Sequence, residues 1–298
     1  MRYKVILMLT GKLYEKYVNA VKFEELRGNI EVVAVVDVAP YAGRIDGWRM
    51  CTAEEAFAYD FDYIICSMGI RETGESARTF AACGIDLDRV LPIGIFSVPC
   101  FDFKEYAKLH HSRVSIIAKN CWGGFTYHSL FMKFTSPFIN MFLSDEGYMK
   151  VLGNLEYYMS LPLAEDDSEA AKGKAYPCAL LGDVNIDLNH YKSFDEAKKC
   201  WDERVCRINW DNLFVMTYTA DINVAQEFDS LPYGKKVIFT SEDFGVPGQI
   251  CLEKFRGSVA DMKSDMWRIV NSVANGTLQL YDPIKLLNGD GDFYRTEG

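Results

Sequence analysis

The chain has 298 residues, of which 49% are hydrophobic and 25% charged, and a formal net charge of -10. This length and balance predict a globular protein of two domains, and without a run of eighteen apolar residues a membrane span is not expected. The acidic charge and the scattered Lys and Arg residues argue against nucleic-acid binding, because a phosphate backbone is repelled by such a surface.

The first third of the chain alternates short apolar runs with helical patterns. Four buried strands are predicted, at residues 3–9, 30–37, 60–67 and 89–92. A helical pattern follows the first run, and residues 71–83 are expected to form another helix. This alternation predicts an α/β fold with an N-terminal Rossmann-like parallel sheet, in a domain that covers residues 1–105.

The turn after the first strand carries an incomplete dinucleotide fingerprint. A Rossmann turn uses three glycines there, and only Gly11 is present. Asp37 ends the second strand, where a ribose-binding carboxylate would lie, although a solvated acid at a strand end is the favoured interpretation. Gly11 and Asp37 are candidate ligand-binding residues.

Four segments of this domain, KVILMLTGKLYEKY, EVVAVVD, FDYIICS and GIDLDRVLPI, resemble the Rossmann-like domains of nucleotide-sugar and sugar-acyl enzymes of bacterial glycan pathways. Such domains often keep the fold without a nicotinamide. The cofactor therefore stays unknown.

Residues 106–298 are predicted to form a second α/β domain with a mixed sheet. The expected elements are a strand at 114–118, a helical pattern at 146–160, an exposed loop at 164–175, a hairpin within 176–191 and further strands at 214–219, 235–240 and 249–252. Ser193 and Glu196 form a capping box that opens a helix running to about Ile208.

The segment AKNCWGGFTYH lies at a predicted strand-to-helix turn. Cys121 at a helix start can have a lowered pKa and act as a nucleophile, and His128 lies one helical turn past Gly124. Gly123 and Gly124 allow a close backbone approach to a ligand, and Asn120 is a further candidate ligand residue. The structural alternative is a buried thiol beside glycines that relieve crowding.

A second polar cluster follows in the predicted hairpin. Its apolar face is expected to contain Val184, Ile186 and Leu188, with His190 continuing that face as a candidate general base. A polar opposite face suits a hydroxyl-rich ligand, and Asp183 and Tyr191 are candidate ligand residues here. A core histidine bonded to a backbone carbonyl is an equally good interpretation of His190.

The third cluster lies at the end of the predicted helix from Ser193. Arg204 and Arg207 are three residues apart and suit a phosphate or carboxylate clamp, although they also suit the negative end of the helix dipole. Asn209 and Asp211 are candidate ligand residues, in a stretch that alternatively serves only as a helix stop.

The nine cysteines are odd in number, and the chain has no C-x-x-C pair. With no secretory signal expected, this predicts reduced thiols in a cytoplasmic protein. No metal site is expected, because the only close histidines, His110 and His111, are adjacent.

The C-terminal clusters together resemble a known family. The segments SIIAKNCWGG, LGDVNIDLNHYKSFDEAKKCW, RINWDNLFV and YDPIKLLNG are similar to a bacterial domain-of-unknown-function family, number 1919, over about residues 106–289. Its members are often labelled exopolysaccharide biosynthesis proteins. The resemblance implies a mixed α/β domain and a setting in surface-glycan assembly, and it assigns no catalytic residue.

Three functions follow from these observations. The first is a glycosyl- or acyltransferase of cell-surface polysaccharide biosynthesis that acts on a sugar or nucleotide-sugar, with Cys121, His128 and His190 as catalytic candidates. The second is a non-catalytic sugar- or nucleotide-binding regulator of glycan assembly. An NAD-linked oxidoreductase ranks third. The expected partner is a small molecule, and the sequence does not predict the oligomeric state.

Overall fold

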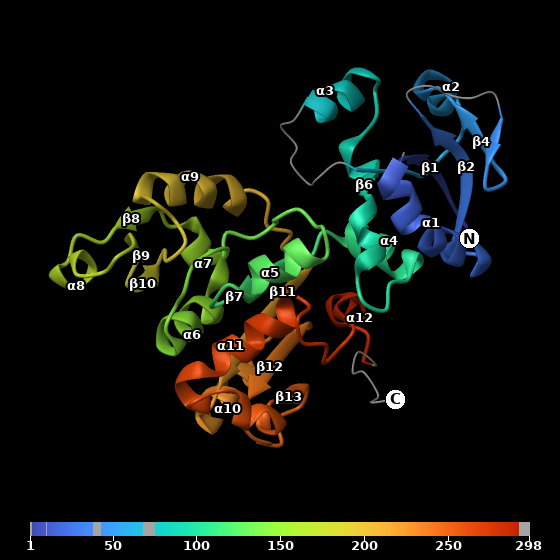
Figure 1. The fold of residues 1–298 in the computed structure, drawn as a ribbon. Coiled ribbons are helices and arrows are strands. Elements are labelled where there is room, and N and C mark those ends of the chain that lie inside the picture. The colour runs from blue at the N-terminus through green and yellow to red at the C-terminus, as the bar shows by residue number, and fades with distance from the viewer. Residues whose placement is uncertain (1, 10, 38–42, 68–74, 292–298) are drawn as a thin grey trace. The chain divides into compact units, whose positions relative to one another are not determined.

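A computed structural model of the chain describes residues 2–9, 11–37, 43–67 and 75–291 (Figure 1). The chain divides into two compact units, Met1–Lys108 with Leu130–Met132 and Leu109–Ser129 with Lys133–Gly298. Both units combine helices with parallel strands, so the predicted α/β class is confirmed. Among the described residues, no helix is long and apolar enough to cross a lipid bilayer.

The N-terminal unit is built on a six-stranded sheet in the order β3-β4-β2-β1-β5-β6 (Figure 1). Its strands are β1 (Tyr3–Met8), β2 (Ile30–Val36), β3 (Arg44–Ile45), β4 (Trp48–Cys51), β5 (Tyr63–Cys66) and β6 (Val90–Pro92). Its helices are α1 (Gly11–Leu26), α2 (Ala53–Phe57), α3 (Glu75–Ala82), the 3-10 helices η1 (Leu87–Arg89) and η2 (Ile93–Ser97), and the start of α4 (Phe103–Ser112).

The four strands predicted for this unit are present as β1, β2, β5 and β6. The predicted helix at 71–83 is α3, and residues 71–74 lie outside the described residues. Neighbouring strands are parallel except β3 and β4, which are antiparallel and make the sheet mixed. This hairpin was not predicted from the sequence, although Asp46-Gly47 is a strong turn signal and both residues have the positive φ that a two-residue turn needs.

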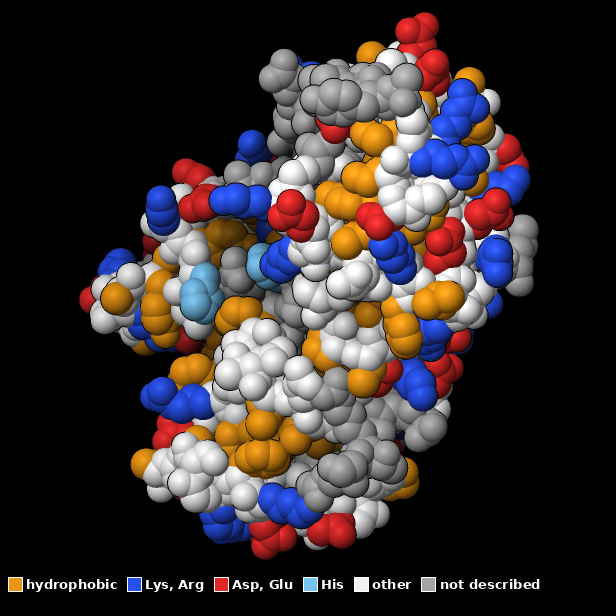
Figure 2. Space-filling model, turned by 45° about the vertical axis from the view of Figure 1, so that its right-hand side comes forward, with side chains coloured by type: hydrophobic (Ala, Val, Ile, Leu, Met, Phe, Trp, Pro, Cys, Tyr) orange, Lys and Arg blue, Asp and Glu red, His pale blue; other side chains and the backbone are white. Residues whose placement is uncertain are grey.

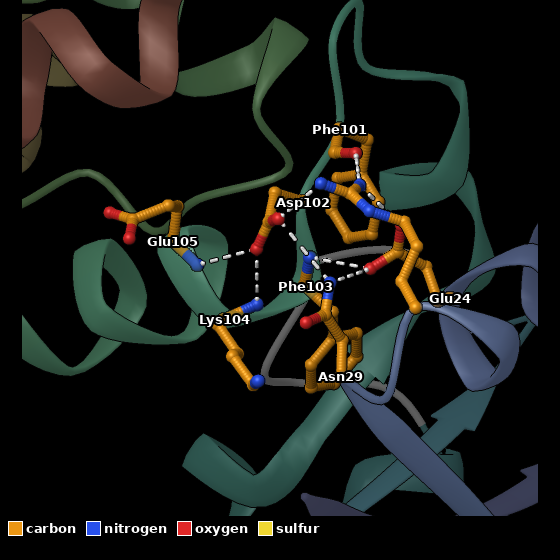
Figure 3. Close-up of polar contacts among 8 residues, drawn as sticks. Glu24, Asn29, Phe101, Asp102, Phe103, Lys104 and Glu105 are labelled. Atoms are coloured by element: carbon orange, nitrogen blue, oxygen red, sulfur yellow. Dashed lines mark hydrogen bonds and ion pairs between the residues drawn. The ribbon is translucent and has the colours of Figure 1, made fainter. Parts of the chain in front are cut away.

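A polar network around the buried Glu24 carboxylate fixes the start of α4 within the N-terminal unit (Figure 3). The Glu24 carboxylate, 2% exposed, accepts hydrogen bonds from Arg27 Nη1 at 2.9 Å, Asn29 Nδ2 at 2.7 Å and the backbone N–H of Phe103 at 2.9 Å. Asp102 accepts from Arg27 Nη2 at 2.6 Å and from two backbone N–H groups of the first turn of α4. One guanidinium thus joins two carboxylates, and the end of α1 is tied to the chain that enters α4.

The C-terminal unit contains two sheets where the sequence predicted one mixed sheet. The four-stranded sheet, in the order β13-β12-β11-β7, is entirely parallel, and the three-stranded sheet β10-β9-β8 is antiparallel. The strands are β7 (Ser115–Ala118), β8 (Leu163–Glu165), β9 (Cys178–Leu181), β10 (Val184–Asp187), β11 (Leu213–Thr219), β12 (Lys236–Thr240) and β13 (Gln249–Cys251). The predicted hairpin is confirmed as β9 and β10.

Helices cover both faces of the parallel sheet (Figure 1). The helices of the C-terminal unit are α5 (Trp122–Ser129), α6 (Asp145–Gly153), α7 (Leu155–Ser160), α8 (Glu169–Lys172), α9 (Phe194–Val205), α10 (Ile222–Ser230), η3 (Glu253–Ser258), α11 (Met262–Ala274) and α12 (Pro283–Asn288), of which α8 and α9 lie beside the antiparallel sheet. On one face, α11 packs against α5, whose Trp122 ring stacks 6.0 Å from the Phe214 ring of β11. On the other face, Val215 belongs to a core with Tyr148 of α6 and Phe228 of α10.

Several helix boundaries differ from the sequence prediction. The pattern at 146–160 is divided into α6 and α7, because Asn154 leaves the helical conformation. The Ser193 side chain caps α9 by accepting from the Glu196 N–H at 3.2 Å, whereas Glu196 Oε2 accepts from the N–H of Lys192 and not of Ser193. Helix α9 ends at Val205, three residues before the predicted end.

Candidate functional site

Buried polar side chains gather where the parallel strands of the C-terminal unit end. Lys119 and Asn120 follow β7, Thr219 ends β11, and Thr240 and Ser241 lie at the end of β12. All five are at most 6% exposed. In open parallel sheets, ligands bind outside the carboxyl ends of the strands, so this edge is the candidate functional site.

The centre of this edge is the buried ammonium group of Lys119. Its Nζ contacts the Asp145 carboxylate, donates to the Tyr218 carbonyl at 2.6 Å and lies 3.9 Å from the centre of the Tyr218 ring. The Lys119 side chain is only 4% exposed, whereas Asp145 is 41% exposed. Burial lowers the pKa of Lys119, and the Asp145 carboxylate opposes that shift.

Local hydrogen bonds place Asp145 over the end of β7. Ser144 caps α6 by accepting from the Gly147 N–H at 3.1 Å, which puts Asp145 at the first helical position. The backbone N–H of Leu143 donates to the Lys119 carbonyl at 2.9 Å. The Tyr148 hydroxyl lies 2.7 Å from the Ile117 carbonyl. Helix α6 is therefore held on the strand that carries Lys119.

A groove of about 370 Å³ opens beside the Lys119–Asp145 pair. Its walls come from two helices, with Asp145, Glu146, Met149 and Lys150 on α6 and Val224 and Glu227 on α10. The Lys150 Nζ lies 3.1 Å from Glu146 and 3.5 Å from Asp183. The groove thus joins an apolar wall to a set of carboxylates, and Asp145 belongs both to the groove and to the buried ion pair.

Cys121 lies close to this pair, but its thiol is not activated. It is 7% exposed, and burial raises the pKa of the thiol to about 11. The prediction of a lowered pKa is wrong, because the loss of water outweighs the favourable backbone environment at the start of α5. Burial also raises the pKa of Tyr218, and Asp145 and Cys121 contribute less to that shift.

The two glycines of the α5 segment are closely packed. A Cβ on Gly123 would lie 3.3 Å from the Ile116 side chain, and one on Gly124 would lie 3.4 Å from Ile139. Asn120 accepts from the Trp122 N–H at 3.1 Å and donates to Asn271 at 3.2 Å. His128 is exposed in the last turn of α5. Their ligand and catalytic roles stay predictions.

The hairpin residues are divided between surface and core. Val184, Ile186 and Leu188 are buried as predicted, but β10 ends at Asp187, and His190 is exposed in the following turn. The prediction that His190 continues the apolar face is therefore wrong. Asp183 is exposed and accepts from the Tyr158 hydroxyl at 2.8 Å, and through Lys150 it is linked to the groove.

Buried Tyr191 instead connects to the end of α9. Its hydroxyl donates to the Ile139 carbonyl at 3.0 Å and accepts from Arg204 Nη1 at 2.7 Å. The Arg204 guanidinium also lies 5.2 Å from the centre of the Phe134 ring. Arg207 pairs with Glu203 at 3.7 Å. Each arginine thus has a partner within the unit, in the absence of any ligand.

Asn209 and Asp211 form a turn. The Asn209 side chain donates to the Ser112 carbonyl at 3.0 Å and accepts from the backbone of exposed Asp211 at 3.3 Å. In the N-terminal unit, Gly11 begins α1 with φ +58° and Asp37 follows β2, so both lie at carboxyl ends of the neighbouring parallel strands β1 and β2.

Of the fourteen predicted residues, Cys121 lies two residues after Lys119 in the chain, and Asp183 is linked to the groove through Lys150. No hydrogen bond or ion pair among the described residues connects Cys121, His128 or His190 with one another. Lys119, Asp145 and Tyr218 were not predicted as site residues. The available signal was a lysine directly after a buried β-branched strand, since lysine is rarely buried without a partner.

The surface charge agrees with the composition. On the face shown in Figure 2, Lys and Arg side chains are mixed with Asp and Glu and do not form one basic patch. No group of three or more His, Cys, Asp or Glu side chains suited to a metal ion occurs in the described part of the chain.

Comparisons with known proteins place most of the chain in one family. Residues 1–91 match a domain described as C2185-like, N-terminal. An uncharacterized protein of Haemophilus influenzae is 36% identical over 140 residues, which cover 46% of this chain and 66% of that protein. Residues 95–286 match the domain of unknown function 1919, and the chain therefore belongs to the DUF1919 family.

Proposed function

We propose that the protein is a transferase that acts on a sugar or nucleotide-sugar, with its reaction centre at the carboxyl edge of the parallel sheet in the C-terminal unit. The observation that carries the proposal is the buried Lys119 ammonium held against Asp145, a carboxylate that also lines a groove. A buried cation at a strand end is costly to maintain, and such perturbed groups concentrate at functional sites.

In this mechanism Asp145 is the general base. An acceptor sugar in the groove presents a hydroxyl to Asp145, which takes the proton as the oxygen forms a bond to the transferred glycosyl or acyl carbon. The bond between that carbon and its leaving group breaks, and the leaving group departs with the electron pair. Lys119 is a positioning residue, because its ammonium group contacts the Asp145 carboxylate and orients it.

The biological setting is part of the proposal. The similarity of four C-terminal segments to exopolysaccharide-labelled proteins favours bacterial cell-surface polysaccharide synthesis in the cytoplasm. We further propose that the N-terminal unit is Rossmann-like and binds the nucleotide of a nucleotide-sugar. Its support is the parallel order β4-β2-β1-β5-β6 and the position of Gly11 and Asp37 at adjacent strand ends.

A non-catalytic sugar-binding regulator of glycan assembly is the second candidate. The specific observation in its favour is that the thiol of Cys121 is protonated at neutral pH and that His128 and His190 are exposed. None of the three nucleophile and base candidates is then poised for chemistry, and Asp145 alone carries the catalytic interpretation.

The test mixes the full chain with a panel of nucleotide-sugars and acyl-CoAs, with and without free sugars. Melting temperature reports binding, because a ligand of the native state must stabilise it, and mass spectrometry reports transfer. The transferase predicts at least one stabilising donor and a new sugar product. Stabilisation without product favours the regulator, and no stabilisation by any donor or sugar contradicts both.

A further inference from the structure

We propose that the groove beside Asp145 is a subsite for an acceptor sugar that carries no phosphate, with preference for a sugar that bears an ammonium group. This inference rests on the proposed function and names the substrate class of the same site. The nucleotide and phosphate groups of a donor must then bind outside this groove.

The charges of the lining carry the inference. Three carboxylates, of Asp145, Glu146 and Glu227, face the groove against one ammonium group, that of Lys150. Lys150 is already held by Glu146 at 3.1 Å and by Asp183 at 3.5 Å. A phosphate entering the groove would therefore meet several carboxylates and no cation without a partner, whereas an ammonium group would be attracted.

Glu227 is the carboxylate best placed to recognise that ammonium group. Asp145 is engaged by buried Lys119, and Glu146 is engaged by Lys150. Within the described residues, no ion pair or hydrogen bond engages the Glu227 carboxylate, which lies on α10 across from α6. A charge-assisted hydrogen bond from a ligand to Glu227 would add to binding without breaking an existing pair.

The remaining lining suits a sugar ring. Met149 and Val224 offer an apolar wall to the C–H face of a pyranose, while the carboxylates accept hydrogen bonds from its hydroxyls. A volume of about 370 Å³ lies at the lower end of the range of small-molecule sites and fits one or two sugar rings. The Lys150–Asp183 contact, with Tyr158 on Asp183, fixes one side of the groove before any ligand arrives.

Calorimetric titration of the full chain with three probes tests this inference: glucosamine, glucose and glucose 1-phosphate. We expect glucosamine to bind most tightly, with Kd in the roughly millimolar range, and glucose 1-phosphate to bind at least about tenfold more weakly. The Glu227→Gln variant should bind glucosamine about tenfold more weakly than wild type, and its Kd for glucose should change by less than about threefold. The Glu227→Lys variant should bind glucose 1-phosphate at least as tightly as it binds glucosamine.

Glu156→Gln is the matched control, since it removes the same charge from an exposed position on α7 that does not line the groove, and it should leave all three affinities unchanged. The inference is overturned if wild type binds glucose 1-phosphate as tightly as glucosamine, if the Glu227 variants bind like wild type, or if no probe binds at roughly 50 mM.

The outcomes separate this inference from the proposed function. If transfer to a sugar occurs and depends on Asp145 but the groove prefers the phosphorylated probe, the substrate class is wrong and the transferase stands. If glucosamine binds as expected but no donor gives a product, the subsite stands and the transferase is wrong.

Discussion

The ion pair of Lys119 and Asp145 predicts an asymmetric effect on stability. Replacing Asp145 by Ala leaves the Lys119 ammonium, 4% exposed, without its counter-charge. Removing one partner of a buried ion pair costs about 3–5 kcal/mol. At pH 7 the cost is limited to about 5 kcal/mol, which is the free energy of deprotonating a lysine with a pKa of 10.5. We expect Asp145→Ala to lower the unfolding free energy by about 3–5 kcal/mol.

Replacing Lys119 by Met should cost less. The carboxylate left behind is 41% exposed and can be hydrated, while the buried alkyl chain keeps a similar volume. The lost hydrogen bond to the Tyr218 carbonyl costs about 1–2 kcal/mol, and the removed desolvation of the ammonium offsets part of that loss. The double variant should therefore be more stable than Asp145→Ala alone.

The lowered pKa of Lys119 predicts how the unfolding free energy changes with pH. A lysine whose folded pKa lies below its unfolded pKa binds fewer protons when folded, so its destabilising effect shrinks as pH rises toward 10.5. The upper limit on the cost of Asp145→Ala should fall by about 1.4 kcal/mol for each pH unit of that rise.

Urea unfolding of the full chain at several pH values, followed by circular dichroism, measures these free energies. Asp60→Ala is the control, because Asp60 pairs with Lys4 where both are exposed, and no change is expected. A cost for Lys119→Met equal to or above that for Asp145→Ala, or a cost for Asp145→Ala that is constant with pH, would refute the reasoning.

Four further predictions concern the rest of the molecule. Burial raises the pKa of the Cys121 thiol from an ordinary value near 9 to about 11. The unfolding free energy should therefore fall by about 3 kcal/mol as the pH rises from about 9 past 11, and Cys121→Ala should abolish this loss in urea unfolding. At neutral pH, iodoacetamide should label exposed Cys83 and Cys206 well before Cys121, and equal rates would contradict its burial. Gly123→Ala should destabilise the protein by about 1–3 kcal/mol through contact with Ile116, whereas Gly153→Ala, with open space around its Cβ, should not; equal effects in thermal unfolding would contradict the packing role. Glu24→Ala should cost about 3 kcal/mol or more, because Arg27, Asn29 and the Phe103 N–H lose a buried acceptor, and a change below about 1 kcal/mol would show that the network adds little.

The sequence predicted elements whose signals are local. Short apolar runs predicted β1, β2, β5 and β6. The alternation of apolar and polar residues predicted the buried face of β10, and Ser193 as a helix cap predicted the start of α9. The division of α6 from α7 was missed, because the spacing of apolar residues continues through Asn154 although the backbone does not. His190 was misplaced for a similar reason, since alternation cannot show that a strand ends at Asp187.

The site depends on contacts that no local pattern reveals. Lys119 lies in the segment in which Cys121 was predicted as a nucleophile, but its partners are Asp145 and Tyr218, which are 26 and 99 residues away in the chain. Arg204 and Arg207 were predicted to clamp a phosphate or carboxylate. In the structure Arg204 donates a hydrogen bond to the Tyr191 hydroxyl, which lies 13 residues earlier in the chain. The residue types therefore indicated the segment after β7, but the Lys119–Asp145 pair could be identified only from the fold.

The most direct measurement compares wild type with Asp145→Asn in transfer to a free sugar, using a donor found with the panel and a temperature at which both proteins are folded. If Asp145 is the general base, kcat should fall by about 100-fold or more, while KM for the sugar changes by less than about threefold. Transfer by Asp145→Asn at the wild-type rate would contradict a reaction centre at the Lys119–Asp145 pair.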